Sequence, residues 1–475
     1  MNAWTWEIFE DAINSVPCVV TNPGPLRAPI KNLSIRRNEE RELILETTGP
    51  GETRGSWKPY PAGTVRRSDE TMEFETPGFT AVARGVTPRS WRRTQNVQAE
   101  TGITTEEASL YSLVLTFQSP ADPQYTIDWI QNFDAQEFRW FGNIADKSER
   151  KATRTLGKGS EAITLKSMST AHSGRNQCVH LVIGGKELFL GAARDDLPKT
   201  IMKPGFILYK GKPDEHEREK IRGCVSFALG TCFIFLGCTV LDTECNPISM
   251  TAVAADTFND RLFKVAVQPP APLEKRYKRE ANPVALGRLA NALYAKYDEL
   301  QFSHLGWAYW HAVCAPVHMA AAHFGAAIEA LQDAYVKAHP SDFQTKLVRE
   351  RKDWQELQGK LLGIVEAAGL PADVQTILVN KVGGLNSVPA SKLSEQVFDH
   401  LGIRLGELEN KAWRQRHIAA HGAFSEDDPV ATIKETKLLK IILHRLLLKI
   451  TGGSDLYRDY YTLDFPNRRL EEPIS

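Results

Sequence analysis

The sequence has no excess of charge of either sign and few cysteines. Lys plus Arg and Asp plus Glu both number 58, so the formal net charge is zero. Any binding to a polyanion must therefore come from local basic patches. The seven cysteines are odd in number and include no C-x-x-C pair, which argues against a zinc site or a disulfide framework. The N-terminus also lacks the pattern of a signal peptide, and the two observations together predict a cytoplasmic location.

Long apolar runs are also scarce. The longest, Val225–Leu241, is about at the lower length limit for a membrane-spanning helix. Gly230 and Gly237 interrupt it, and a charged run leads into it. We expect a helix that ends near Gly230, then a buried strand over Cys232–Leu241, and no membrane partner.

Several well-known catalytic motifs are missing. The chain has no H-E-x-x-H, G-x-S-x-G or G-x-G-x-x-G segment, and Gly157–Ser160 lacks the spacing of a P-loop. Nothing in the sequence indicates a zinc protease, a serine hydrolase or an NTPase, and we expect no metal and no cofactor.

The chain is long enough for two or three domains and changes character along its length. Residues 1–266 carry short alternating or apolar runs separated by Gly and Pro, which predicts a β-rich region of one or two subdomains. Residues 267–283 hold four prolines and a basic run, typical of a linker. Residues 284–452 predict an all-helical bundle, and 453–475 a tail. The expected fold class is a multidomain α+β protein.

The predicted helices follow apolar residues at helical spacing, with Pro316 expected to kink or split the second. They are Ala285–Leu300, Leu305–Ala338, Asp342–Ala368, Asp373–Val382, Ser391–Leu401, Gly406–Ala420 and Pro429–Ile450.

Local basic segments offer several candidate contacts for nucleic acid. They are the cluster of Arg84, Arg89, Trp91, Arg92 and Arg93, the run Lys275–Arg279, and the stretches Lys346–Lys352 and Lys437–Lys449. An ordinary solvated surface is the more usual role of such segments.

The segment Lys411–Phe424 (KAWRQRHIAAHGAF) carries a set of residues with a clear chemistry. His417 and His421 are four residues apart and share one helical face, which Arg414 joins. Arg416 precedes His417. Neighbouring imidazoles can serve as base and acid in phosphodiester cleavage near neutral pH, and arginine can pair with phosphate oxygens through two donors. No metal is required by such a set.

This segment resembles the R-x4–6-H motif of the HEPN superfamily, in which a polar residue follows the arginine. Here the motif reads Arg416-His417-x3-His421 and is followed by Gly422, similar to the common "AHG" ending. The helical stretch Trp307–Tyr335 looks like the HEPN helix that packs beside the motif. A β-rich half followed by such a domain resembles the ApeA-like antiphage defence proteins.

The resemblance covers roughly Ala285–Ile450 and implies a metal-independent endoribonuclease. It implies that His421 is the main acid or base, that Arg416 binds the scissile phosphate, and that His417 orients groups or relays a proton. It further implies a homodimer that joins two motifs, a product with a cyclic phosphate and a 5′-hydroxyl, and a toxic role in antiphage defence or abortive infection. The N-terminal half would then sense a phage-derived trigger or restrain the nuclease.

Alternatives stay open at this point. Arg175-Asn176-x3-His180 also satisfies the pattern but lies in a segment predicted to be a strand, whereas the motif needs a helix. Arg414 fits the spacing to His421 as well as Arg416 does, so it is a possible phosphate-binding residue. The competing function is a non-catalytic binding or dimerisation module beside a β-rich ligand-binding domain. The nuclease hypothesis expects Arg416 and His421 to face an open, positively charged cleft at a two-fold interface. It would fail if they were packed under the bundle or pointed into separate solvent.

Overall fold

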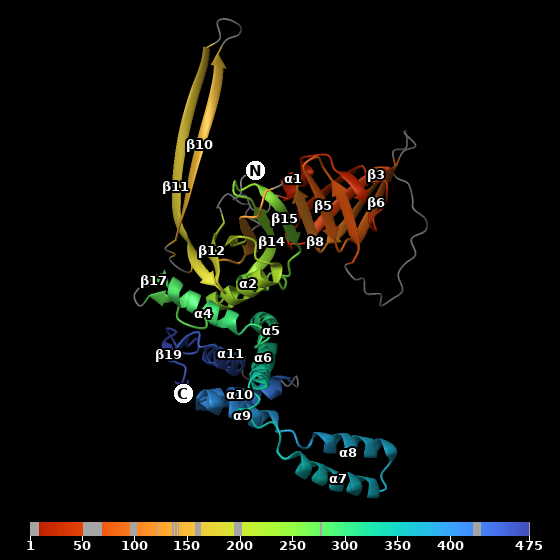
Figure 1. The fold of residues 1–475 in the computed structure, drawn as a ribbon, viewed down its shortest axis with the longest axis vertical. Helices are drawn as coiled ribbons and strands as arrows, with labels where there is room; N and C mark the ends of the chain where they lie inside the picture. Colours follow the sequence, from red (N-terminus) through yellow and green to blue (C-terminus); the bar gives the residue numbers. More distant parts are fainter. Residues whose placement is uncertain are drawn as a thin grey trace. The chain divides into compact units, whose positions relative to one another are not determined.

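The computed structural model shows an α+β protein with a large antiparallel sheet in the N-terminal region and a C-terminal helical region (Figure 1). The contacts divide it into two compact units, one made of Met1–Pro269 and Leu273–Tyr294 and the other of Pro270–Pro272 and Ala295–Ser475. The structure describes residues 9–50, 69–95, 102–119, 121–134, 137, 140, 142–156, 163–193, 202–275, 278–420 and 429–474.

Two sheets build the first unit. The larger has eleven strands in the order β1-β4-β5-β8-β15-β14-β9-β13-β12-β11-β10, and the smaller has the order β2-β3-β7-β6. The strands are β1 (Val19–Asn22), β2 (Asn32–Arg37), β3 (Leu43–Pro50), β4 (Thr71–Glu75), β5 (Phe79–Arg84), β6 (Thr87–Gln95), β7 (Gly102–Leu110), β8 (Ser112–Phe117), β9 (Tyr125–Gln131), β10 (Gly142–Leu156), β11 (Ile163–Ile183), β12 (Lys186–Ala192), β13 (Gly205–Lys210), β14 (Ile234–Leu241) and β15 (Pro247–Val253).

Alternating side chains set the faces of these strands. Every second residue of β5 and β7 is buried, as expected for strands with one face toward a core. The core between the sheets includes Leu43, Leu45 and Leu115, and the short helix α1 (Phe9–Asn14) adds Phe9.

The longest apolar run of the sequence folds as predicted. Helix α2 (Glu215–Leu229) begins at Asp214, whose carboxylate accepts from the Glu217 N–H at 2.8 Å. It ends at Gly230, which adopts φ 70°, and the chain enters the buried strand β14. In the part of the chain that the structure describes, no helix is long and apolar enough to cross a membrane.

A buried ionic cluster fixes α2 on the sheet. Asp128 of β9 is fully buried and pairs with both Arg218 and Arg222 of α2, the latter at 2.5 Å. The Tyr209 hydroxyl donates to the same carboxylate at 3.2 Å. Glu215 closes the cluster toward solvent by pairing with both arginines. Burial beside Asp128 raises the pKa of Tyr209 well above its ordinary value.

Strands β10 and β11 form a two-stranded ribbon that extends beyond the sheet (Figure 1). Their register runs from Gly142↔Cys178 to Leu156↔Ile163, and β11 pairs with β12 only from Cys178 onward. The segment Arg175–His180 therefore lies in a strand, which confirms the prediction made for this second copy of the motif pattern.

Helix α4 (Pro283–Ala295) groups with the β-rich unit. Asn291 accepts from the Gly184 N–H at 3.0 Å and donates to the Val182 carbonyl at 2.7 Å, so it holds the β11–β12 turn. The Tyr294 ring lies where a side chain on Gly184 would stand. The division of the chain thus falls after Tyr294, whereas the sequence placed the start of the helical domain at residue 284. Strand β16 (Glu274–Lys275) pairs with strand β17 (Lys278–Ala281) in antiparallel fashion.

The second unit is a helical bundle. Its helices are α5 (Phe302–Cys314), α6 (Val317–Ala338), α7 (Arg351–Ala367), α8 (Ala372–Gly384), α9 (Ala390–Leu401), α10 (Glu407–Ala420) and α11 (Pro429–Thr451). Pro316 separates α5 from α6, as expected, because it lacks the N–H that a continuous helix needs. The helix predicted from Asp342 begins only at Arg351, because residues 346–348 instead bond to residues 386–388.

The segment after α11 packs on the bundle. It forms the hairpin β18 (Leu456–Arg458) and β19 (Asn467–Arg469), with Tyr457 and Leu470 buried. Arg445 of α11 holds this segment on the bundle, because it donates to the Leu470 carbonyl. The same arginine pairs with Glu409 of α10 at 2.6 Å, and both charged side chains are fully buried. This segment is therefore an integrated part of the helical unit rather than a loose tail.

Candidate functional site

Helix α10 carries the motif, and its start is fixed by a side-chain cap. The Glu409 carboxylate accepts from the Gly406 N–H at 2.9 Å, which satisfies a donor that the helix cannot use. A side chain on Gly406 would collide with the Ile474 carbonyl, so glycine is required. Ala412 and Trp413 are buried. The helix is thus anchored at its first turn, and the predicted helical setting of the motif is confirmed.

Arg416 points into the bundle and is only 6% exposed. Its guanidinium donates from Nε and Nη2 to one carboxylate oxygen of Glu329 on α6, at 3.1 and 2.9 Å. The carbons of its stem lie 3.1–3.4 Å from the position that a Cβ on Gly325 would take. Gly325 and Glu329 are four residues apart, so one face of α6 provides both the space and the charge for this arginine.

Trp413 completes the pocket around the guanidinium. The carbon of that group lies 3.4 Å from the centre of the Trp413 ring, and Nη1 donates to the Trp413 carbonyl at 2.5 Å. A guanidinium has five N–H donors, and these bonds use three. Two donors thus remain unused by the described partners and are held in a fixed orientation.

The structure describes the other motif residues to different extents. Arg414 is exposed on α10. The backbone of His417 lies within α10, but its side chain lies outside the described residues, as does all of His421. The structure therefore brings Arg416 together with Trp413 and Glu329, and it does not report on the spacing of the two imidazoles.

The single chain buries Arg416 instead of presenting it at an open surface, and the cleft expected at a two-fold interface stays a prediction. Trp413 and Arg416 are three residues apart, so they share the face of α10 that packs on α6. Both side chains are buried because they lie on that face. Glu329, whose side chain is 46% exposed, stands at the rim of this contact. Solvent thus reaches the pair from the carboxylate side.

A second set of titratable groups lies inside the bundle between α5 and α11. The Tyr309 hydroxyl and His444 Nε2 are 3.0 Å apart and both residues are buried. Burial raises the pKa of Tyr309 and lowers the pKa of His444 well below its ordinary value, with Lys440 contributing to the latter. Burial lowers the pKa of Lys440 to about 8. We interpret this set as part of the core, since Tyr309, Phe324 and His444 pack ring against ring.

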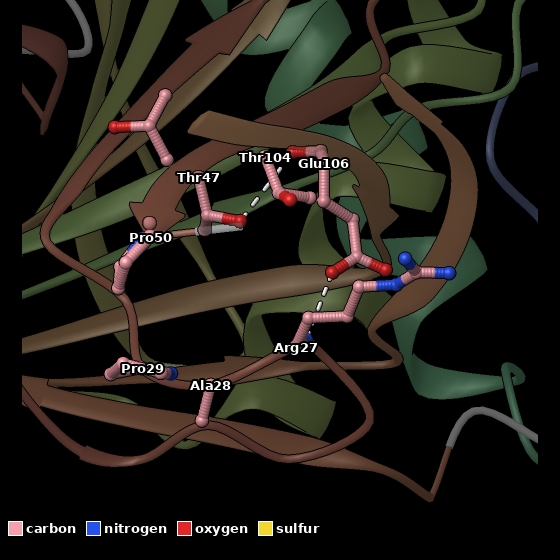
Figure 2. Close-up of a pocket in the computed structure, with 9 residues that line it drawn as sticks. Arg27, Ala28, Pro29, Thr47, Pro50, Thr104 and Glu106 are labelled. Carbon is pink, nitrogen blue, oxygen red and sulfur yellow. Dashed lines mark hydrogen bonds between the residues drawn. The ribbon is translucent and has the colours of Figure 1, made fainter. Parts of the chain in front are cut away.

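Figure 2 shows a small pocket in the described part of the N-terminal unit. Glu106 of β7 lies on one side and accepts from the Arg27 N–H at 2.9 Å. The pocket has room for about one water molecule, which is too little for a substrate. Nearby, the Arg27 guanidinium lies 4.0 Å from the ring centre of Trp91, whose side chain is 51% exposed. Trp91 is thus covered on one face by an arginine, and the other arginines of the predicted cluster lie on β5 and β6.

Within the described residues, no three His, Cys, Asp or Glu side chains are grouped closely enough to hold a metal ion. No family model, curated protein or solved structure matches the chain. The case for function therefore depends on the site itself. The residues that sequence reasoning missed are Gly325, Glu329 and Trp413; the i, i+3 spacing of Trp413 and Arg416 was the available signal.

Proposed function

We propose that the helical unit is a metal-independent endoribonuclease and that α10 carries its active residues. His421 would be the acid or base, His417 an orienting or proton-relaying group, and Arg416 the phosphate-binding residue. The single observation that supports this proposal most is the held guanidinium of Arg416. Glu329 and Trp413 fix its orientation, and two N–H donors stay unused by the described residues, which is the arrangement that binding of a phosphate through two donors needs.

Arg414 provides a second cation on the same helix. Its side chain is exposed and forms no ion pair with the described residues, so it can reach a phosphate outside the bundle. We propose that Arg414 attracts the RNA backbone, while Arg416 acts at the scissile phosphate. Such a division suits an enzyme whose net charge is zero, because binding then depends on local cations.

We also propose that the active form is a homodimer through the helical unit. Exposed apolar side chains on α5 and the first turn of α6 support this, namely Trp307 at 58%, Val317 at 46% and Met319 at 40%. A dimer that joins two α10 helices would also enclose the arginines in a shared cleft. The β-rich unit would serve as the sensing or restraining part in cytoplasmic antiphage defence.

The test is cleavage of total RNA in EDTA by the wild type, by His421→Ala and by the control His323→Ala, which changes an exposed histidine on α6. We expect the wild type and the control to cut and His421→Ala to be inactive. Equal cutting by all three would place the active site elsewhere. If none cuts, even with phage lysate added as a source of trigger, the competing function gains support: a non-catalytic dimerisation module.

A further inference from the structure

Over most of its length, the β10–β11 ribbon has no third strand paired beside it in the described part of the chain. From Gly142 to Leu156, β10 pairs with β11, and no third strand is bonded to β10 or to Ile163–Gln177 of β11 in the described part of the chain. Fifteen residue pairs span about 50 Å at 3.4 Å per residue. An isolated two-stranded ribbon is only marginally stable in water, so this length indicates a binding partner.

The charge of the ribbon identifies the chemistry of that partner. By sequence, its two strands (142–156 and 163–177) contain six Lys and Arg but two Asp and Glu, in a chain whose net charge is zero. Lys147, Lys151 and Lys166 are all exposed. Lys166 stands opposite Thr153, two residues beyond Lys151, so the register places the three lysines on one face of the ribbon. Glu149 accompanies them and pairs with Lys147 at 2.8 Å.

The other described side chains on that face are small or apolar. Thr153 and Thr170 offer hydroxyls, and Met168 is 65% exposed opposite Lys151. Hydroxyls and lysines are the usual donors to phosphate oxygens. The charged residues along the open edge of β10 also oppose pairing with the same edge of a second copy.

We propose that the β-ribbon binds double-stranded DNA through its lysine face. The major groove of B-form DNA, about 12 Å wide, admits a two-stranded ribbon, whereas the major groove of duplex RNA is deep and narrow. The ribbon thereby gives the β-rich unit a ligand class, a DNA duplex recognised mainly through its phosphates. This binding is separate from the RNA cleavage proposed for α10.

The experiment measures fluorescence anisotropy of a labelled DNA duplex of about two helical turns, and of an RNA duplex of the same sequence, with the full-length protein. The test variant changes Lys147, Lys151 and Lys166 to Gln. The control changes three exposed lysines elsewhere, Lys31, Lys210 and Lys392, to Gln, so the net charge is matched. We expect the test variant to bind DNA at least about tenfold more weakly at 0.1 M salt.

The salt dependence gives a second readout. Loss of three phosphate contacts makes the negative slope of log K against log salt less steep by about 2.7, and the control leaves the slope unchanged. A second variant replaces residues 148–171 by a short turn; Ser148 and Ala171 are paired, so the remaining strands keep their register. This shortened ribbon should behave like the test variant.

Equal DNA binding by the test and control variants would overturn the proposal, and so would tighter binding to the RNA duplex. A shift from dimer to monomer on shortening the ribbon, without DNA binding by the wild type, would assign the ribbon to self-association instead. Because His421→Ala should bind DNA like the wild type, failure of the nuclease proposal is distinguishable from failure of this one.

Discussion

The pairing of Arg416 with Glu329 predicts a measurable coupling between α10 and α6. The perturbation is a double-mutant cycle of Arg416→Ala, Glu329→Ala and the double variant. Surface ion pairs contribute about 0.2–1 kcal/mol, whereas breaking a fully buried pair costs about 3–5 kcal/mol. Arg416 is 6% exposed and the Glu329 side chain 46%, so this pair lies between those limits. We expect a coupling free energy of about 1–2 kcal/mol.

The single variants should differ in size. Glu329→Ala leaves a buried cation whose remaining partners among the described residues are the Trp413 carbonyl and ring, so it should destabilise by about 2 kcal/mol. Arg416→Ala also removes the stem that packs on Gly325. The matched control is Arg414→Ala, since Arg414 is exposed on the same helix and should change stability by less than about 0.5 kcal/mol.

The assay is urea unfolding followed by both circular dichroism and tryptophan fluorescence. A coupling energy below about 0.3 kcal/mol would refute the reasoning, because additive changes mean that the two side chains do not interact. Arg416→Lys tests the geometry: it keeps the charge but cannot donate from a planar fork, so it should recover less than half of the coupling.

Four further outcomes are expected. Asp128→Ala leaves two buried arginines without their shared carboxylate and should lower the unfolding free energy by about 3–5 kcal/mol in urea titrations. Burial holds the pKa of His444 well below its ordinary value. As the pH falls below about 6.5, the unfolded state therefore takes up a proton that the folded state does not, and the unfolding free energy should decrease by up to about 1.4 kcal/mol per pH unit. The variant His444→Gln should reduce this pH dependence. Gly230→Ala places a Cβ 2.0 Å from backbone at a positive φ and should lower the melting temperature by several degrees, about 1 kcal/mol or more, in calorimetry. Trp307→Glu should shift a dimer to monomer in light scattering, and an unchanged mass would exclude this surface from the interface.

Local signals predicted much of the fold. The glycine at 230 and the proline at 316 mark the boundaries of α2 and α6 correctly, because each residue has a backbone property that no partner needs to supply. The predicted helices over 391–401, 406–420 and 429–450 agree with α9, α10 and α11 to within one residue at each end. The apolar stripe of the segment 429–450 was the clearest of these signals.

Features that depend on distant partners could not be predicted. Strand β10 reads ADKSERKATRT over most of its length, with no apolar period to identify it, and only its pairing with β11 makes it a strand. Residues 342–350 have helical composition, but bonds to residues 386–388 are stronger than that preference.

In the candidate site, too, the local helix could be predicted, whereas the contacts with distant residues could not. The sequence predicted a helix over 406–420 that carries Arg414, Arg416 and His417, and α10 is helical there. The direction of Arg416 follows from Gly325 and Glu329, which lie more than eighty residues earlier in the chain. Sequence spacing placed the arginine on the helix but could not show that a carboxylate already holds it.

The position of α4 has a consequence for how such a chain can be assembled by gene recombination. A breakpoint in the Pro-rich stretch 267–283 would transfer α4 with the helical unit and strip it from the β11–β12 turn. Leu286, Leu289 and Leu293 of α4 are buried, and α4 groups with the β-rich unit that it would leave. A breakpoint after Tyr294 leaves both parts with their own cores. Natural exchange of either part between proteins should therefore favour the later junction, even though the proline-rich segment has the composition of a linker.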